Sequence, residues 1–409
     1  MHLLPDRVRP QSSAGEDYTV TIHRGRAGLK QLTADRDRLT QSLDAGQVDD
    51  FLDWYTCYLD VYVRDPDTVF FCEVWRGDRA VAILPVRTMA RWLFGIRIPA
   101  LELLNTLRMP TGGSIVTDGS DPQSYASLLF EELKRTVRPR WHYLRLANVR
   151  SDCTFAAAMA LALTHLRVHV SGADWCPVVP EEQFLQRLGK NFARKLRQNR
   201  RKVEGTAEAA FSTVSTLPEL EQAYEDFLKA EASSWKGQQG TCTALLFDQP
   251  MREFYRQLMR RLAARQRCEI HLLRLDDRPI AGQYTLVTGD TVYVLKIGYD
   301  GDYARLSPGV VLQDRLFRYC ANRPSIQRLD FTTDMPWMKN WQPTREDVFD
   351  WICFRPTLRA RIAHAYWWLA RVALYHRRTW AAPLYRRLFG THQQRYKRKQ
   401  EKESSPDEQ

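Results

Sequence analysis

The segment from Tyr293 to Gly309 carries the residues best suited to bind a ligand. An apolar strand runs through a polar loop to Ser307, Pro308 and Gly309, which have the pattern of a helix start. Serine caps helices, proline suits the first helical position, and glycine lets a ligand approach the backbone. With Arg305 nearby, the free N–H groups and the helix dipole predict a pyrophosphate site. Plain helix capping without a ligand is the alternative.

Seven short segments of the chain occur in the order found in a known protein family. They are Phe192–Arg197, Glu231–Gly237, Arg278–Gly282, Ile297–Asp300, Ser307–Gly309, Leu329–Phe331 and Lys339–Trp341. From about Phe184 to Trp351 the sequence resembles the GNAT-like acyltransferases called BioF2-like or CelD-like, distant relatives of the Fem-type aminoacyltransferases. Each segment alone is weak evidence for this family, and the resemblance is specific only because all seven occur in the family's order.

The resemblance implies an N-acyltransferase that moves an acyl group, acetyl by preference, from acyl-CoA to an amine. The implied acceptor is an amino sugar or a lipid-linked saccharide of cell-envelope or exopolysaccharide biosynthesis. Backbone groups of Leu295, Lys296, Ile297 and Gly298 would pair with the pantetheine amides, and no metal is implied. A Fem-like transferase using aminoacyl-tRNA is one alternative, and a GNAT-like scaffold without turnover is another. Lys296 is unusual in an apolar strand, although strand alternation can simply direct it to solvent.

Acyl transfer to an amine needs a proton acceptor and a donor that stabilises the oxyanion. Glu231, Asp300 and Asp330 are the candidate bases, and a chain of water molecules is the alternative. By resemblance, Lys339 stabilises the oxyanion; otherwise it is a surface lysine between tryptophans.

A strongly basic helix is predicted from Phe184 to Val203, with a buried stripe and, on its other faces, seven basic residues between Lys190 and Lys202. A solvated face is the usual meaning of such a run, and contact with a phosphate is the alternative. Arg194 is the preferred contact, because a guanidinium group can hold phosphate through two hydrogen bonds. Trp235, Lys236 and Tyr299 are the other candidates for substrate binding.

The chain has the pattern of a duplicated α/β domain with mixed, mostly antiparallel sheets flanked by helices. Gly77–Ala82 and Asp276–Ala281 align as the turns of two similar hairpins, each followed by further strands, a helix and a strand. The expected tandem GNAT-like domains are residues 18–170 and 179–355. The first copy has Met109–Ile115 where the second has its Ser-Pro-Gly loop, so we expect coenzyme binding only in the second.

Composition narrows the protein class further. The 409 residues include eight cysteines with no Cys-x-x-Cys pair, so no zinc site or disulfide framework is predicted. His165 and His169 alternate like strand residues and lack a third ligand. There is no signal-peptide pattern and no uninterrupted apolar run of spanning length, so we expect a cytoplasmic enzyme.

Much of the net charge of +12 lies near the C-terminus. Residues 356–409 hold twelve Lys or Arg and four acids, an excess of eight positive charges. Residues 356–398 predict a basic, aromatic-rich helical tail, with Leu358, Ile362, Tyr366, Leu369 and Val372 on one side. Such a helix suits an anionic membrane surface at the inner face of the membrane, or docking on the protein itself. Residues 1–17 and 399–409 are expected to be disordered.

Overall fold

The structure is a computed structural model that describes residues 18–376 except 105–114, 152, 162, 207 and 239. The chain divides into two compact units. The described residues of Met1–Trp175, Thr332–Pro336 and Thr344–Leu369 form unit 1, and those of Cys176–Phe331, Trp337–Pro343 and Ala370–Gln409 form unit 2. The expected disorder at residues 1–17 and 399–409 lies outside the described residues, as does most of the tail beyond His376.

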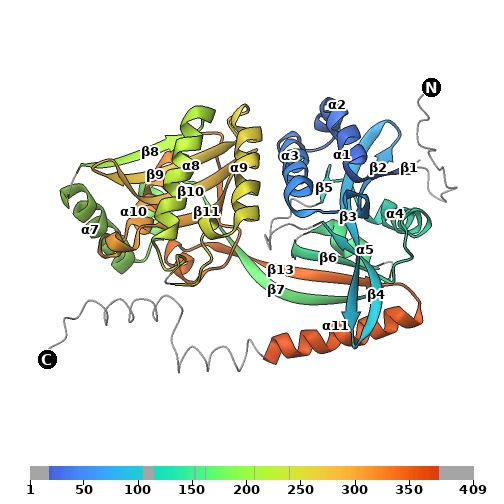
Figure 1. Ribbon diagram of the computed structural model, residues 1–409. Helices are drawn as coiled ribbons and strands as arrows, with labels where there is room; N and C mark the ends of the chain where they lie inside the picture. Colours follow the sequence, from blue (N-terminus) through green and yellow to red (C-terminus); the bar gives the residue numbers. More distant parts are fainter. Residues whose placement is uncertain are drawn as a thin grey trace. The chain divides into compact units, whose positions relative to one another are not determined.

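Unit 1 is a mixed sheet with helices on both faces (Figure 1). Its elements are β1 (Tyr18–Arg24), α1 (Gly25–Ala34), α2 (Arg36–Ser42), α3 (Ala45–Tyr62), β2 (Val69–Arg76), β3 (Arg79–Leu93), β4 (Ile96–Leu103), β5 (Val116–Thr117), α4 (Gln123–Thr136), β6 (Tyr143–Arg150), α5 (Thr154–Leu161), β7 (Thr164–Pro177), β13 (Thr344–Phe354) and α11 (Leu358–His376). The strand order is β1-β2-β3-β4-β6-β13-β7, with β5 beside β3. Alternation along β2 builds two cores, since Phe71 packs with α1–α3 and Phe70 with α4 and α5.

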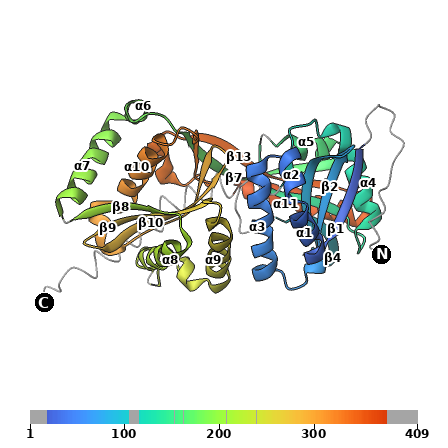
Figure 2. The ribbon, with the colours of Figure 1, turned by 90° about the horizontal axis from the view of Figure 1, so that it is seen from above.

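Unit 2 repeats this layered arrangement. Its elements are α6 (Glu181–Arg187), α7 (Lys190–Thr206), β8 (Ala209–Val214), α8 (Leu217–Ala232), α9 (Gln249–Ala263), β9 (Cys268–Leu275), β10 (Arg278–Thr288), β11 (Thr291–Tyr299), α10 (Pro308–Ala321) and β12 (Arg328–Asp330), with short 3-10 helices η3 (Leu245–Phe247), η4 (Gly301–Leu306) and η5 (Pro336–Trp341). The strand order is β12-β11-β10-β9-β8. Figure 2 shows α7 and α10 on one face of this sheet and α8 and α9 on the other.

Both units therefore follow one plan, in which a strand, helices and three antiparallel strands lead to a further helix and a parallel strand. The parallel pairs are β4–β6 in unit 1 and β11–β12 in unit 2. This confirms the predicted α/β fold with tandem GNAT-like units. The predicted limits 18–170 and 179–355 stay a prediction; in the structure, β13 belongs to unit 1 because it pairs with β6 and β7.

One local prediction was wrong. The single helix expected over residues 184–203 is two helices, α6 and α7, with Leu188 and Gly189 between them. In α11, Leu358 and Leu369 are exposed, and the small residues Ala360 and Ala363 are buried. Small side chains let the helix backbone approach the sheet closely, which hydrophobic spacing alone does not indicate.

The described part of the tail helix packs on unit 1. Thr357 bonds His142 at 2.9 Å, and its hydroxyl also accepts from the Ala360 N–H at 3.2 Å. The Arg145 guanidinium lies 5.1 Å from the centre of the Trp367 ring. Of the two alternatives for the tail, docking on the protein itself therefore holds for the start of α11.

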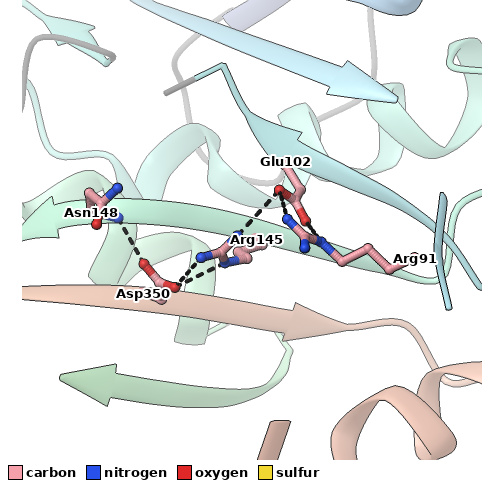
Figure 3. Close-up of polar contacts among 5 residues, drawn as sticks. All are labelled: Arg91, Glu102, Arg145, Asn148 and Asp350. Atoms are coloured by element: carbon pink, nitrogen blue, oxygen red, sulfur yellow. Dashed lines mark hydrogen bonds and ion pairs between the residues drawn. The ribbon is translucent and has the colours of Figure 1, made fainter. Parts of the chain in front are cut away.

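Beside α11, a buried chain of alternating charges crosses four strands of unit 1 (Figure 3). Arg145 on β6 lies between Glu102 on β4 and Asp350 on β13, and Arg91 on β3 holds Glu102 from the other side. Asp350 is 4% exposed and also accepts the backbone N–H of Asn148 at 2.9 Å. Each buried charge thus has opposite partners, as buried ions require.

We predict that Asp350→Ala destabilises unit 1 by about 3 kcal/mol or more, because it leaves Arg145 and the Asn148 N–H without their shared acceptor. Lys134→Ala, which removes the half-buried partner of the exposed Glu131, should cost less than about 1 kcal/mol. Chemical denaturation of both variants checks the difference. Equal, small losses would contradict the role given to the charge chain.

Candidate active site

The parallel strands β11 and β12 part after a short paired stretch. Thr291, Val292 and Tyr293 pair with residues 328–330, and β11 then continues to Tyr299. The register with β10 shifts so that Leu295 forms a β-bulge. Beyond Tyr293, no strand in the described part of the chain pairs with this edge of β11. Its backbone groups can therefore take part in hydrogen bonds to a bound ligand.

The start of α10 follows β11 by one short turn. Ser307 occupies the N-cap position with a left-handed backbone (φ 53°), and Pro308 is the first helical residue. The prediction that the Ser307 side chain caps the helix was wrong, since its hydroxyl makes no cap hydrogen bond. The Ser307 carbonyl instead accepts from the N–H groups of Val310 and Val311. The hydroxyl is thus not used by the helix, and the positive end of the dipole remains open to an anion.

A cavity of about 530 Å³ lies at this helix start, within unit 2. It is bounded by the beginning of α7, the beginning of α10 and the end of η5. Its lining residues are Gly189, Lys190, Asn191, Phe192, Lys195, Asn199, Ser307, Val310, Asn340 and Gln342. The lining holds two lysines and no acid, so the cavity suits a negatively charged ligand.

Three cavity residues are unpartnered within the described part of the chain. Lys190 and Lys195 are exposed and form no ion pair there. Asn199 is only 6% exposed, yet its side-chain amide makes no hydrogen bond to another described residue. Its amide atoms are not fully buried, so they are open to the cavity and can donate a hydrogen bond to a ligand oxygen. Sequence reasoning counted both lysines in the basic run but preferred Arg194 as the phosphate contact, and it missed Asn199.

Glu231, in the last turn of α8, is held by the tight loop that follows the helix. Its carboxylate accepts from Lys236 Nζ and from the Leu245 backbone N–H, each at 2.8 Å. Lys236 also donates to the Ile297 carbonyl of β11. Gly298 lies so close that an added Cβ would be 2.5 Å from the Glu231 Cβ. The structure thus brings Glu231, Lys236 and Gly298 together, with the carboxylate neutralised by its partners.

The other two carboxylates are also engaged. Asp300 is buried, pairs with Arg278 at 2.7 Å and caps η4 through the Asp302 N–H. Asp330 is fully buried at the end of β12 and accepts from Arg328 at 2.9 Å. To act as the base, either carboxylate would have to break or share the hydrogen bond to its arginine.

The remaining predicted residues lie at several places on unit 2. Lys339 is exposed on η5, next to Asn340 of the cavity. Arg194 on α7 and Arg305 at the end of η4 are exposed, and neither lines the cavity. Trp235 is half-buried in the loop that holds Lys236. Tyr299 is half-buried near Gly309, where an added Cβ would lie 3.7 Å from its ring. A side chain is therefore sterically tolerated at Gly309.

Lys296 lies on the opposite face of β11 from the cavity. Its Nζ is 3.5 Å from the Met251 sulfur and 5.2 Å from the centre of the Tyr255 ring, so it points at α9 and is half-buried. Burial lowers the pKa of Lys296 from its ordinary 10.5 to about 8, and the nearby Glu231 charge opposes this shift. Its side chain is thus not directed to open solvent.

Metal chemistry has no obvious centre in this site. Among the described residues, no group of three or more His, Cys, Asp or Glu side chains is placed to hold a metal ion. His165 and His169 lie on β7, as their alternation predicts. The helices between residues 18 and 376 include none that is both long and apolar enough to cross a membrane.

Part of the chain matches a known family model. Residues 190–339 match the family model described as an acetyltransferase (GNAT) domain. This stretch holds α7, the parting strands and the start of α10. The chain thus contains a GNAT acetyltransferase domain, as its sequence resemblance implies, and the protein is an acyltransferase.

Solved structures show only distant likeness. FemX is 10% identical with a TM-score of 0.45, covering 68% of this chain and 87% of its own. A conserved protein of unknown function from Bacteroides thetaiotaomicron VPI-5482 is 12% identical with a TM-score of 0.49, and the match covers 79% of this chain and 97% of that protein. A tandem GNAT protein from the clavulanic acid biosynthesis pathway is 11% identical with a TM-score of 0.38, and the match covers 83% of this chain and 99% of that protein. No curated protein matches the chain. Because these TM-scores are below 0.5, none assigns a substrate.

We predict that Lys296→Met stabilises the protein by about 1–3 kcal/mol at pH 7, because methionine fills a similar volume without a buried charge. Between about pH 8 and 10.5 the folded wild type has lost the proton that its unfolded chain still binds. The wild-type free energy of unfolding therefore rises with pH in this window relative to that of the variant. The stability advantage of Lys296→Met over the wild type shrinks accordingly. Denaturation at pH 7 and pH 9.5 checks this; a gain that is constant with pH would contradict it.

Proposed function

We propose that the protein is an N-acyltransferase that uses acyl-CoA, with the phosphates of the donor bound at the start of α10. The observation that carries the proposal is the acid-free cavity, where a helix N-terminus, the Asn199 amide and two lysines without ion pairs among the described residues converge. These groups fit a pyrophosphate, because N–H donors and cations surround one space. Acyl-CoA supplies the activated thioester.

The unpaired edge of β11 supports the same placement for the rest of the donor. Residues 294–299 lead from the parted strands to η4 and then to α10, so one extended ligand can follow this path. Pantetheine carries amides that can pair with the backbone of Leu295–Gly298. In the transfer, the acceptor nitrogen bonds the thioester carbonyl carbon and the carbon–sulfur bond breaks. The amine proton passes through a base to the departing thiolate, which is released as the thiol.

For the acceptor we propose an amine on an amino sugar or a lipid-linked saccharide of the cell envelope. This choice follows the family resemblance. Lys339 is our choice for stabilising the oxyanion, because it is an exposed cation on η5 beside the cavity and forms no ion pair with a described residue. Glu231, Asp300 and Asp330 stay the proposed bases, and the Glu231–Lys236 pair contacts β11 at Gly298 and at the Ile297 carbonyl.

We predict that Gly309→Asp abolishes acetyl-CoA binding at tens of micromolar while the fold stays intact. The new carboxylate repels the donor phosphates, and the structure has room for a side chain there. Gly309→Ala is the matched control and should keep binding within a few-fold. Calorimetry measures both, with thermal melting as the fold control. Unchanged affinity in the Asp variant would remove the helix start from the proposed site.

We predict that Lys339→Ala lowers kcat by about 10²–10³ and changes acetyl-CoA affinity little, because its role belongs to the transition state. Lys30→Ala, at an exposed position on α1 of unit 1, is the control. Thiol release with a panel of amino sugars gives the rate. Wild-type binding without thiol release on any amine would favour the scaffold alternative, and full turnover in the Lys339 variant would remove that residue from the mechanism.

A further inference from the structure

The tip of the β3–β4 hairpin exposes three large apolar side chains. Trp92 is 70% exposed, Phe94 57% and Ile96 40%. Single exposed apolar residues are ordinary on protein surfaces, but three within five positions at one tip form a patch. The GNAT domain, residues 190–339, does not include this hairpin.

Phe94 occupies a backbone conformation that disfavours it. Phe94 and Gly95 form the turn between Leu93 and Ile96, with φ angles of 50° and 75°. Such two-residue turns prefer asparagine or glycine at the first position, because a bulky side chain is strained at positive φ. The ring therefore brings strain to the turn and remains mostly in solvent. Strain retained at an exposed site points to a use for the side chain.

The outward face of α11 continues this patch. The rings of Phe94 and Tyr366 meet edge to face at 5.5 Å, so the hairpin tip lies against the helix (Figure 1). With Ala360 and Ala363 turned to the sheet, Leu358, Trp368 and Leu369 are 76%, 44% and 49% exposed. We call the three exposed tip residues and these three helix residues the aromatic face.

The surroundings of the aromatic face are basic. Residues 87–97 and 358–376 together contain six arginines and no acid. Arg97 and Arg361 are exposed and form no ion pair with the residues that the structure describes. Exposed aromatic rings among unpaired arginines fit the boundary of an anionic bilayer, where rings sit at headgroup level and cations meet lipid phosphates.

We infer that the aromatic face binds an anionic lipid surface through Trp92, Phe94 and the outward residues of α11. This inference does not depend on acyl transfer, although it would bring the enzyme to a lipid-linked acceptor. It places membrane contact on the folded unit 1 and not solely on the basic residues beyond His376.

The test is co-sedimentation of the full chain with vesicles of phosphatidylcholine alone or with about 30 mol % phosphatidylserine, at low and high salt. The variants are Phe94→Asn and Trp92→Ser. Phe247→Ser is the matched control, because Phe247 is a 46% exposed apolar residue on η3 of unit 2. Melting temperature and acetyl-CoA affinity are measured for every variant.

The wild type should bind the anionic vesicles, and less at high salt. Phe94→Asn and Trp92→Ser should each weaken that binding about tenfold, whereas Phe247→Ser leaves it unchanged. Phe94→Asn should melt at the same or a higher temperature, because asparagine suits the turn. Equal vesicle binding by wild type and Phe94→Asn would overturn the inference, as would no wild-type binding. Loss of a wild-type dimer in these variants would assign the face to a second copy and also overturn it.

Discussion

The site depends on one constraint, which is that β11 and β12 are hydrogen-bonded over only three residues before they part. Backbone N–H and C=O groups need partners, so an open strand edge inside a domain calls for something to complete it. The turn through η4 then brings the start of α10 to the end of the same strand. The open edge of β11 and the start of α10 therefore follow one another along the chain. Together they suit one long ligand, with amides that pair with the strand edge and phosphates that bind at the helix N-terminus.

Charge is arranged differently in the two units. In unit 1, the parallel pair β4–β6 meets at Leu101 and Glu102, near the end of β4, and the alternating chain from Arg91 to Asp350 satisfies the buried charges across the strands. In unit 2, the pairing lies at the start of β11, and the cavity beside α10 keeps cations without acidic partners. The same plan thus gives one unit with satisfied charges and one with charges left for a ligand, which supports coenzyme binding in unit 2.

The sequence predicted the fold class and the position of the helix start, because hydrophobic periodicity and a Ser-Pro-Gly turn are local signals. It did not predict features that arise from distant contacts. Asn199 is one polar residue within a basic helix, and only the packing of α7 against α10 makes it a buried cavity residue. The binding of Glu231 by Lys236 requires the compact loop between them. The burial of Ala360 and Ala363 in α11 likewise depends on packing that the hydrophobic spacing does not indicate.

The most direct measurement is a pair of calorimetric titrations of the full chain, with acetyl-CoA and with acetyl-pantetheine, which lacks the phosphates. The account predicts that acetyl-CoA binds at tens of micromolar or tighter and that acetyl-pantetheine binds at least about 100-fold more weakly, because the helix start and the cavity lysines lose their anion. It also predicts that added salt weakens only the acetyl-CoA complex. Equal affinity for the two donors would contradict the phosphate site on which the proposed function rests.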